Sequence, residues 1–391
     1  MKTWNRFLSL AGTAAFLFTL GACGGGGSST SSPETGSLRL ALTDAPACGY
    51  DHVYVTIERV RVHQSSSAEA NDSGWSDVVL SPPRRVDLLT LTNGVLDELG
   101  QTPLPVGRYT QMRLVLAANG NTSPYANAVW PTGAVGEVAL TTPSAQQSGL
   151  KMNVNIDIAA NRMADFVIDF DACKSIVLAG NSGRYLLKPV ISVIPRYVSG
   201  VLGYVDASVL NATVSLQQAG VVIKSTVPDL TGRFLLQPVA PGTYDLVLTA
   251  PGRTTAVVTG VPVSADTVLS LNAATAAMAP ASSASGVANG AISVTPAGPL
   301  DATLRALQTI APTTIEVAST RSDETTGLYS MTLPLAEPVL TAYAVPLPPF
   351  TAASGVAGQY TLQANLYGSV KSADPVSVPA SGAATTNFSF P

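Results

Sequence analysis

The stretch Ser37-Leu38-Arg39-Leu40-Ala41-Leu42-Thr43 carries leucine at every second position. Successive side chains of a β-strand point to opposite faces, so the three leucines share one face. The pattern predicts a half-buried strand, and the following Asp44-Ala45-Pro46 predicts the turn that ends it. This strand indicates the fold class, because the chain around it repeats the same kind of segment.

Further short strands are predicted over most of residues 36–198. The alternating or apolar segments lie at 53–57, 75–80, 86–91, 109–116, 153–158, 166–170 and 185–194. The apolar positions change phase between Ile57 and Val60, which predicts a β-bulge near Glu58-Arg59 or a strand that changes sheets. Many short strands separated by turns are typical of an antiparallel β-sandwich, which we predict for this first domain.

The first 22 residues have the parts of a secretory signal peptide. Lys2 and Arg6 give a positive region, and the apolar run 7–20 is shorter than the roughly 20 residues that a membrane-spanning helix needs. Leu20-Gly21-Ala22-Cys23 resembles the lipobox of bacterial lipoproteins. The resemblance implies cleavage before Cys23 and lipidation of its thiol. The alternative is an ordinary signal peptide that is cut nearby.

Residues 23–35 are predicted to form a flexible, lipidated tether. Gly, Ser and Thr dominate residues 24–33, and such a segment has a root-mean-square reach of roughly 5–6 Å × √n. Gly24 stands where, in Gram-negative lipoproteins, an aspartate favours retention at the inner membrane. The resemblance therefore implies a lipid-anchored protein of the cell envelope, at the outer membrane of a Gram-negative bacterium.

Composition indicates a secreted β-protein. The 391 residues suffice for several domains, and 46% of them are hydrophobic, so building cores is no difficulty. Charged residues make up only 12%, about half the usual share. The net charge is −4 and no basic run occurs, which argues against nucleic acid as a partner.

Cys48 and Cys173 remain once Cys23 is assigned to the anchor. An even pair in an oxidising compartment predicts a disulfide, and two buried free thiols are the alternative. The bridge would close a long loop, for which the chain-entropy model gives roughly 4–5 kcal/mol of stabilisation.

Four segments of the first domain resemble a known family. They are Leu42-Thr43-Asp44-Ala45-Pro46, Val53-Tyr54-Val55-Thr56-Ile57, Asp169-Phe170-Asp171-Ala172 and Leu187-Lys188-Pro189-Val190. In this order they look like domain of unknown function 4382, found in bacterial lipoproteins, and the resemblance covers nearly all of 36–198. It implies a location and a β fold, but no activity and no catalytic residues.

Residues 199–272 follow a different pattern. Asp229-Leu230-Thr231-Gly232-Arg233-Phe234 and Pro241-Gly242-Thr243-Tyr244 resemble the turns of the carboxypeptidase regulatory-like family, a small transthyretin-like sandwich close to carbohydrate-binding-like folds. The catalytic part of a carboxypeptidase is absent from the sequence, because neither histidine begins a His-x-x-Glu pair.

The same turns return after an Ala- and Ser-rich stretch at 273–285, which predicts a linker. Ser322–Tyr329 and Gly358–Leu362 resemble the two turns and imply a second, divergent regulatory-like domain over 286–391. The interval between them is longer and proline-rich, and proline belongs on loops and edge strands. We predict a loop or edge cover at Pro334, Pro338, Pro346, Pro348 and Pro349.

The acidic residues Asp44, Asp165, Asp169 and Asp171 allow a Ca²⁺ site through oxygen ligands. Asp169 and Asp171 would share one face of a strand. The other interpretation, which we favour, is that Asp44 caps a turn and the remaining three pair with arginine or with backbone groups. We therefore expect no cofactor, with Ca²⁺ as the alternative.

The sequence favours binding over catalysis. It holds only two histidines, His52 and His63, and no recognisable catalytic motif, so an enzyme with a carboxylate-based site is the less favoured hypothesis. Trp75, Tyr125 and Trp130 lie in or near predicted loops and are candidates for a glycan site, although core or rim positions are the alternative. We expect tandem β-sandwiches on a lipid tether that bind a glycan or an envelope protein. The alternative is a structural spacer or adhesion stalk, in which three sandwiches in series form an extended rod.

Overall fold

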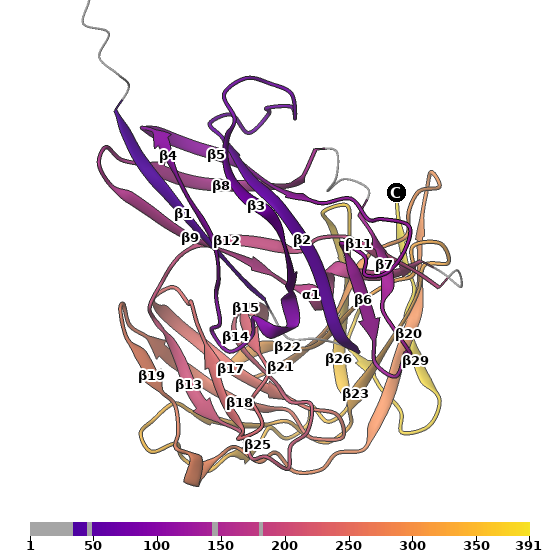
Figure 1. Ribbon diagram of the computed structural model, residues 1–391. Coiled ribbons are helices and arrows are strands. Elements are labelled where there is room, and N and C mark those ends of the chain that lie inside the picture. Colours follow the sequence, from indigo (N-terminus) through magenta and orange to yellow (C-terminus); the bar gives the residue numbers. More distant parts are fainter. Residues whose placement is uncertain (1–33, 45–48, 143–147, 180–182) are drawn as a thin grey trace, which may run out of the picture.

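The computed structural model describes residues 34–44, 49–142, 148–179 and 183–391. Leu38, Leu40 and Leu42 lie on β1 (Thr35–Asp44) and are fully buried, as predicted. β1 pairs antiparallel with β4 (Asp97–Pro105) and parallel with β9 (Met163–Phe170), and β12 (Ile191–Pro195) completes a four-stranded sheet. Figure 1 shows this sheet in the upper left part of the molecule.

A second sheet of the first domain packs against it. Its strands are β2 (Tyr50–His63), β3 (Ser76–Asp87), β5 (Gly107–Leu116), β6 (Ala128–Pro131), β7 (Val138–Thr141), β8 (Leu150–Ile158), β10 (Ile176–Ala179) and β11 (Arg184–Leu187). The predicted bulge is confirmed, because the register of β2 shifts between Ile57 and Arg59 against both neighbours. The strand predicted at 86–91 is wrong beyond Asp87. The Asp87 carboxylate accepts the N–H of Leu89 and starts a 3₁₀ helix (Leu88–Thr90).

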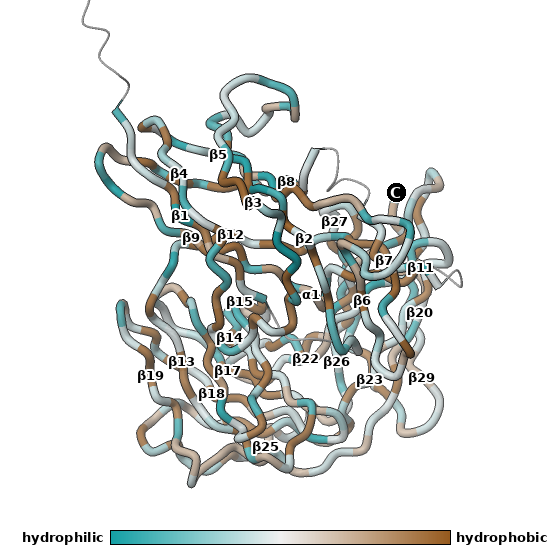
Figure 2. The backbone as a smooth tube through the Cα atoms, viewed as in Figure 1, coloured by the Kyte–Doolittle hydropathy of each residue, from teal (hydrophilic) through white to brown (hydrophobic). Residues whose placement is uncertain are grey.

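The second domain has two sheets around its own core. The smaller contains β13 (Gly200–Tyr204), β16 (Arg233–Leu236) and β19 (Val268–Ser270). The larger contains β14 (Thr213–Gln218), β15 (Val221–Thr226), β17 (Gly242–Thr249) and β18 (Ala256–Val263). Hydrophobic and hydrophilic positions both occur along these strands (Figure 2), and on β14 the buried Val214 and Leu216 alternate with Thr213 and Ser215, which is the pattern that a sandwich requires.

The third domain is also a sandwich. One sheet contains β20 (Ser285–Val294), β23 (Leu328–Pro334), β29 (Ala383–Thr385) and β30 (Phe388–Phe390). The other contains β21 (Thr303–Ile310), β22 (Thr313–Arg321), β26 (Gln359–Leu366), β27 (Ser369–Ser372) and β28 (Val376–Ser377). The tandem all-β architecture is confirmed. Each domain nevertheless includes a parallel pair, such as β1 with β9 and β20 with β29.

The second and third domains each contribute residues to the other. Within the proline-rich interval, β24 (Val339–Ala342) pairs with β18 of the second domain, and β25 (Thr351–Ala352) extends that sheet further. In return, Val247 and Val257 of the second domain are buried in the core of the third. The interval therefore covers the edge of a neighbouring domain, which shields β18 from pairing with another chain.

Residues 273–285, the predicted linker, include a 3₁₀ helix (Ala274–Ala276) and the buried Met278, which packs in the core of the second domain. The expectation of three domains in an extended rod is wrong. The Arg321 guanidinium of the third domain donates to the carbonyl of Lys174 in the first at 2.6 Å, and Lys224 of the second contacts Asp169 of the first at 2.9 Å. Each domain thus contacts both others.

None of the helices in the described ranges is long and apolar enough to cross a bilayer.

Candidate functional site

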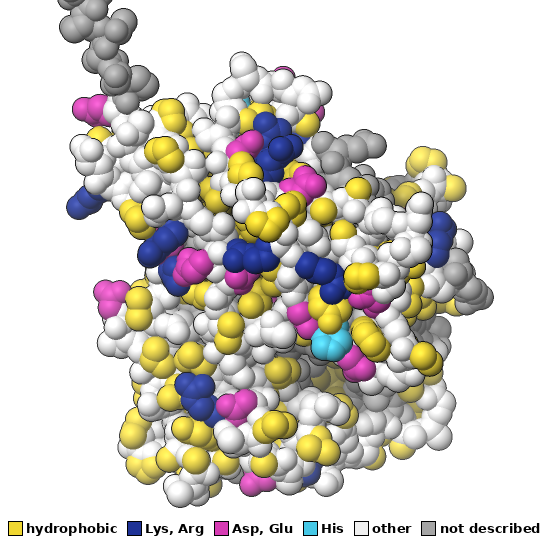
Figure 3. All heavy atoms as spheres, viewed as in Figure 1, with side chains coloured by type: hydrophobic (Ala, Val, Ile, Leu, Met, Phe, Trp, Pro, Cys, Tyr) yellow, Lys and Arg dark blue, Asp and Glu magenta, His cyan; other side chains and the backbone are white. Residues whose placement is uncertain are grey.

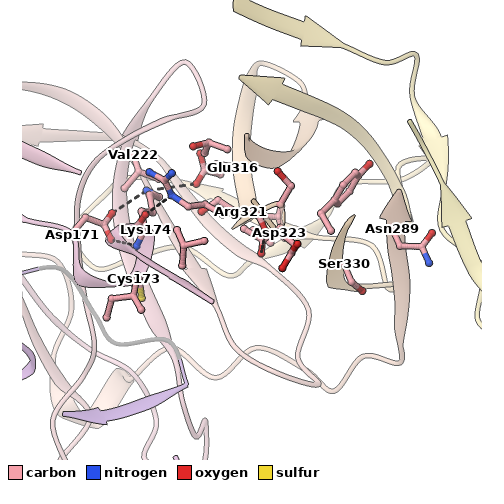
Figure 4. Close-up of a pocket in the computed structure, with 18 of the residues that line it drawn as sticks. Asp171, Cys173, Lys174, Val222, Asn289, Glu316, Arg321, Asp323 and Ser330 are labelled. Atoms are coloured by element: carbon pink, nitrogen blue, oxygen red, sulfur yellow. Dashed lines mark hydrogen bonds and ion pairs between the residues drawn. The ribbon is translucent and has the colours of Figure 1, made fainter. Parts of the chain in front are cut away.

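A cavity of about 1040 Å³ lies where the three domains meet. The first domain contributes the short helix α1 (Ala172–Ser175) and β10, the second contributes β14, β15 and β17, and the third contributes β20, β22 and β23. Figure 4 shows Asp171, Cys173 and Lys174 on one side of the cavity and Asn289 and Ser330 on the other.

Local hydrogen bonds fix α1 at the cavity wall. The Asp171 carboxylate caps the helix by accepting the N–H of Lys174 at 3.0 Å, and the buried Asp44 carboxylate accepts the N–H of Ala172 at 2.9 Å. The Ser175 hydroxyl donates to the Asp171 carbonyl at 2.5 Å. These bonds satisfy groups that so short a helix cannot satisfy internally, and they hold Lys174 towards the cavity.

Lys174 is paired rather than free. Its Nζ lies 3.2 Å from Asp171 Oδ2 and 4.0 Å from Glu316 Oε1 of the third domain. Burial lowers the pKa of Lys174, but the two carboxylates raise it by more, so the ammonium stays charged. Arg305 Nε lies 2.5 Å from the other Glu316 oxygen. The resulting four-residue network neutralises its own charges.

A second ionic cluster joins the first and third domains. Lys188 Nζ lies 3.3 Å from Asp301 and 3.4 Å from Glu324, and Arg321 lies 3.7 Å from the same Asp301. Burial lowers the pKa of Arg321, and Asp301 and Asp171 offset part of that effect. On the face of the molecule shown in Figure 3, most charged side chains also lie beside a charge of opposite sign.

Most of the remaining cavity wall is hydroxyl-bearing or apolar. Six lining residues have side-chain hydroxyls that make no hydrogen bond to another residue of the described part of the chain: Thr213, Ser225, Thr249, Thr303, Ser319 and Ser330. Ile176, Val222, Leu328 and Tyr329 add apolar surface. The arrangement can therefore hydrogen-bond a polar molecule while packing against its apolar faces.

The three aromatic residues predicted for a glycan site do not form one platform. Trp75 packs against His63 at one end of β2, whereas Trp130 lies across from His52 at the other end. At roughly 3.3 Å per strand residue, these ends are about 35 Å apart. Tyr125 lies in the loop before β6, where its N–H donates to Glu137 at 2.7 Å. None of the three lines the cavity within the described residues.

The four acidic residues of the Ca²⁺ hypothesis have separate partners. Asp165 pairs with Arg39 and lies 3.8 Å from Arg196, Asp169 pairs with Lys224, and Asp171 and Asp44 hold α1. In the described ranges, no group of three or more His, Cys, Asp or Glu side chains is placed to hold a metal ion. Asp165 pairs with arginine and Asp171 with a backbone N–H, as in the favoured interpretation, whereas Asp169 pairs with a lysine and Asp44 accepts the N–H of the distant Ala172.

The two histidines also lie outside the cavity. His52 Nδ1 lies 2.6 Å from Asp87 Oδ2 on the β2–β3 pair. His63 contacts the carbonyl of Ser73 at 3.0 Å and the N–H of Ser65 at 2.8 Å. Both rings therefore have partners within the first domain.

Cys23 and Cys48 lie outside the described residues, so the lipid anchor and the Cys48–Cys173 bridge stay predictions. Cys173 lines the cavity on α1. Sequence reasoning singled out none of the hydroxyl residues, because Ser and Thr are common and their convergence depends on how three domains dock. The sequence signals that do reach the cavity are the Asp169–Ala172 segment, which leads into α1, Cys173, and the Ser322–Tyr329 turn.

Comparison with known proteins supports the domain order. Residues 35–189 match the family described as "Domain of unknown function (DUF4382)", and residues 201–276 match the "Carboxypeptidase regulatory-like domain". No curated protein matches the chain. The similarity of residues 286–391 to the regulatory-like family stays a prediction.

Among solved structures, the chain is similar to a mutant type II cohesin–X-dockerin complex from Acetivibrio cellulolyticus. That match has 26% identity over 22% of this chain and 58% of the other, with a TM-score of 0.19. The TIE protein of Bacillus anthracis matches at 11% identity over 91% and 50% of the two chains, with a TM-score of 0.18. A streptococcal ancillary pilin matches at 9% identity over 90% and 98%, with a TM-score of 0.16. These TM-scores are too low to inform the fold or the function of this chain.

Proposed function

We propose that this protein is a cell-envelope lipoprotein that binds a ligand without transforming it, in the cavity at the three-domain junction. Cys23 anchors it to the outer membrane of a Gram-negative bacterium, and the Gly/Ser-rich tether holds the folded part away from the bilayer. The observation that carries the proposal is the cavity itself, a concave site at a domain junction, where ligand sites are common.

The partners of the charged side chains at the cavity support a non-catalytic role. General acid–base or nucleophilic chemistry needs a group that can exchange a proton or attack. Lys174, Glu316 and Arg321 are instead held by ionic partners or backbone carbonyls. The histidines lie elsewhere on the first domain.

Carbohydrate is the leading ligand class. The unpaired hydroxyls beside apolar side chains resemble the alternating polar and apolar surface of a sugar. An envelope protein is the other candidate partner. A purely structural spacer or adhesion stalk is the second candidate function, and the reciprocal exchange between the second and third domains favours it by making a rigid block.

The test is a binding assay with the full-length, lipidated protein in detergent. Isolated cell-wall polysaccharides and detergent-solubilised envelope fractions are passed over the immobilised protein, and bound material is eluted and identified. We expect retained carbohydrate that is recovered with its chain length unchanged. Shortened glycans would contradict the non-catalytic role. Retention of nothing from either source would favour the structural spacer.

A further inference from the structure

We infer that the cavity selects an uncharged oligosaccharide, gripped between the hydroxyl-bearing face of the second domain and β22 of the third. This inference rests on the proposed function, which requires only that the cavity bind some ligand. It adds the charge class of the ligand and the residues that grip it.

One wall is a hydroxyl-bearing sheet face. Thr213 of β14 lies directly opposite Thr249 of β17, and Ser215 of β14 lies opposite Ser225 of β15. Side chains in such pairs project from the same face of the sheet. All four residues line the cavity. This face therefore presents a grid of hydroxyls. Those of Thr213, Thr249 and Ser225 can each donate one hydrogen bond and accept two, whereas the Ser215 hydroxyl already accepts one from Gln217 at 3.0 Å.

The facing wall comes from the third domain. Ser319 of β22 lies opposite Arg305 of β21, and Thr303 lies opposite Arg321, so these four share a face. Arg305 and Arg321 are engaged with Glu316 and with the Lys174 carbonyl. Ser319 and Thr303 are the members of this face whose side chains have no partner within the described ranges. The available groups on both walls are thus neutral.

Charge balance argues against an acidic ligand. The charged side chains that line the cavity are Asp171, Glu316 and Asp323 on one hand and Lys174 and Arg321 on the other, a net negative set. A carboxylate or sulfate would have to displace an acidic partner from Lys174, and removing one partner of a buried pair is costly. A neutral polyol can bond to the hydroxyls and leave every ion pair in place.

Size and apolar surface agree with a chain rather than a single sugar. The volume of about 1040 Å³ reaches the upper end of the roughly 300–1,000 Å³ that ligand sites occupy. Tyr50 of the first domain, half-buried at the wall, can pack against the C–H face of a sugar ring.

The experiment compares neutral and acidic oligosaccharides on the full-length protein. The probes are hexasaccharides of glucose, mannose and N-acetylglucosamine, with oligogalacturonate and a sulfated oligosaccharide as the acidic set, and binding is measured by calorimetry. We expect affinity for at least one neutral probe. Thr249→Val and Ser319→Ala should each weaken it about tenfold, the effect of one lost hydrogen bond. The matched control is Thr361→Val, a half-buried threonine on β26 that does not line the cavity.

The outcomes distinguish the inference of a neutral ligand from the proposed function, which is ligand binding in the cavity. Binding of acidic probes alone, weakened by the cavity variants, would overturn the neutral selectivity and leave the proposed function standing. Neutral binding that Thr249→Val and Ser319→Ala leave unchanged would overturn the assignment to this cavity. Failure of every glycan and every envelope fraction to bind would overturn the proposed function as well.

Discussion

The side-chain amide of Gln217 bonds to the backbone of Glu316 as a neighbouring strand would. The Glu316 N–H donates to Gln217 Oε1 at 2.8 Å, and Gln217 Nε2 donates to the Glu316 carbonyl at 2.9 Å. β22 has β21 as its neighbour on one side only in the described sheet, so this amide closes part of its open edge. It also joins the second domain to the third at the cavity.

Replacing Gln217 with leucine should destabilise the protein by about 2–4 kcal/mol, because two buried backbone groups of Glu316 lose their partners. Chemical denaturation would measure the change. The control is Gln218→Leu at the adjacent, exposed position, where one exposed hydrogen bond to Thr243 is lost. Equal effects of the two substitutions would show that the amide pairing does not stabilise the junction.

The sequence predicts those features of the fold that depend on residues close together in the chain. Leu38, Leu40 and Leu42 fall on a buried face because their period matches the pleat, and the phase change after Ile57 marks the bulge. The pairing of β24 with β18 has no such signal, because a parallel contact between two domains depends on docking. The cavity was unpredictable for the same reason, since its walls come from elements more than 100 residues apart in sequence, such as α1 with Lys174 and β22 with Glu316.

The Cys48–Cys173 disulfide is tested by alkylation. The mature protein is unfolded in denaturant and treated with a maleimide, with and without prior reduction. We expect both thiols to be blocked before reduction and to react after it, since the envelope is oxidising. The Cys173→Ser variant serves as the control, because it should leave Cys48 reactive without reductant. Two reactive thiols in the unreduced wild-type protein would rule the bridge out.

Metal removal should leave the stability unchanged. Asp165 and Asp169 are already neutralised by arginine and lysine, so Ca²⁺ would have to compete with built-in cations. We expect the thermal midpoint to be the same in a chelator, in buffer and with added Ca²⁺, as measured by scanning calorimetry. A clear rise with Ca²⁺ that the Asp171→Asn variant abolishes would instead restore the calcium hypothesis.

The lipid anchor is tested by Cys23→Ala. Without the thiol no acyl chain can be attached, so the variant loses the lipid part of its anchor. We expect the wild-type protein in the membrane fraction and the variant outside it, and a radiolabelled lipid precursor should label the wild type alone. Ser29→Ala in the tether is the control and should fractionate as wild type. A Cys23→Ala protein that sediments with membranes would contradict the anchor.

The buried ion pair between the first and second domains gives the sharpest test of their docking. Lys224 Nζ lies 2.9 Å from Asp169 Oδ1, with side-chain exposures of 3% and 11%. Lys224→Met leaves a carboxylate buried without its partner and should cost about 3–5 kcal/mol, as measured by denaturant unfolding. Lys224→Met combined with Asp169→Leu removes both charges and should recover part of that loss.

The exposed Arg108–Asp157 pair at 3.4 Å is the matched control, where Arg108→Met should change stability by less than about 1 kcal/mol. If Lys224→Met is as mild as Arg108→Met, or if the double variant is no more stable than Lys224→Met alone, the pair does not hold the two domains together.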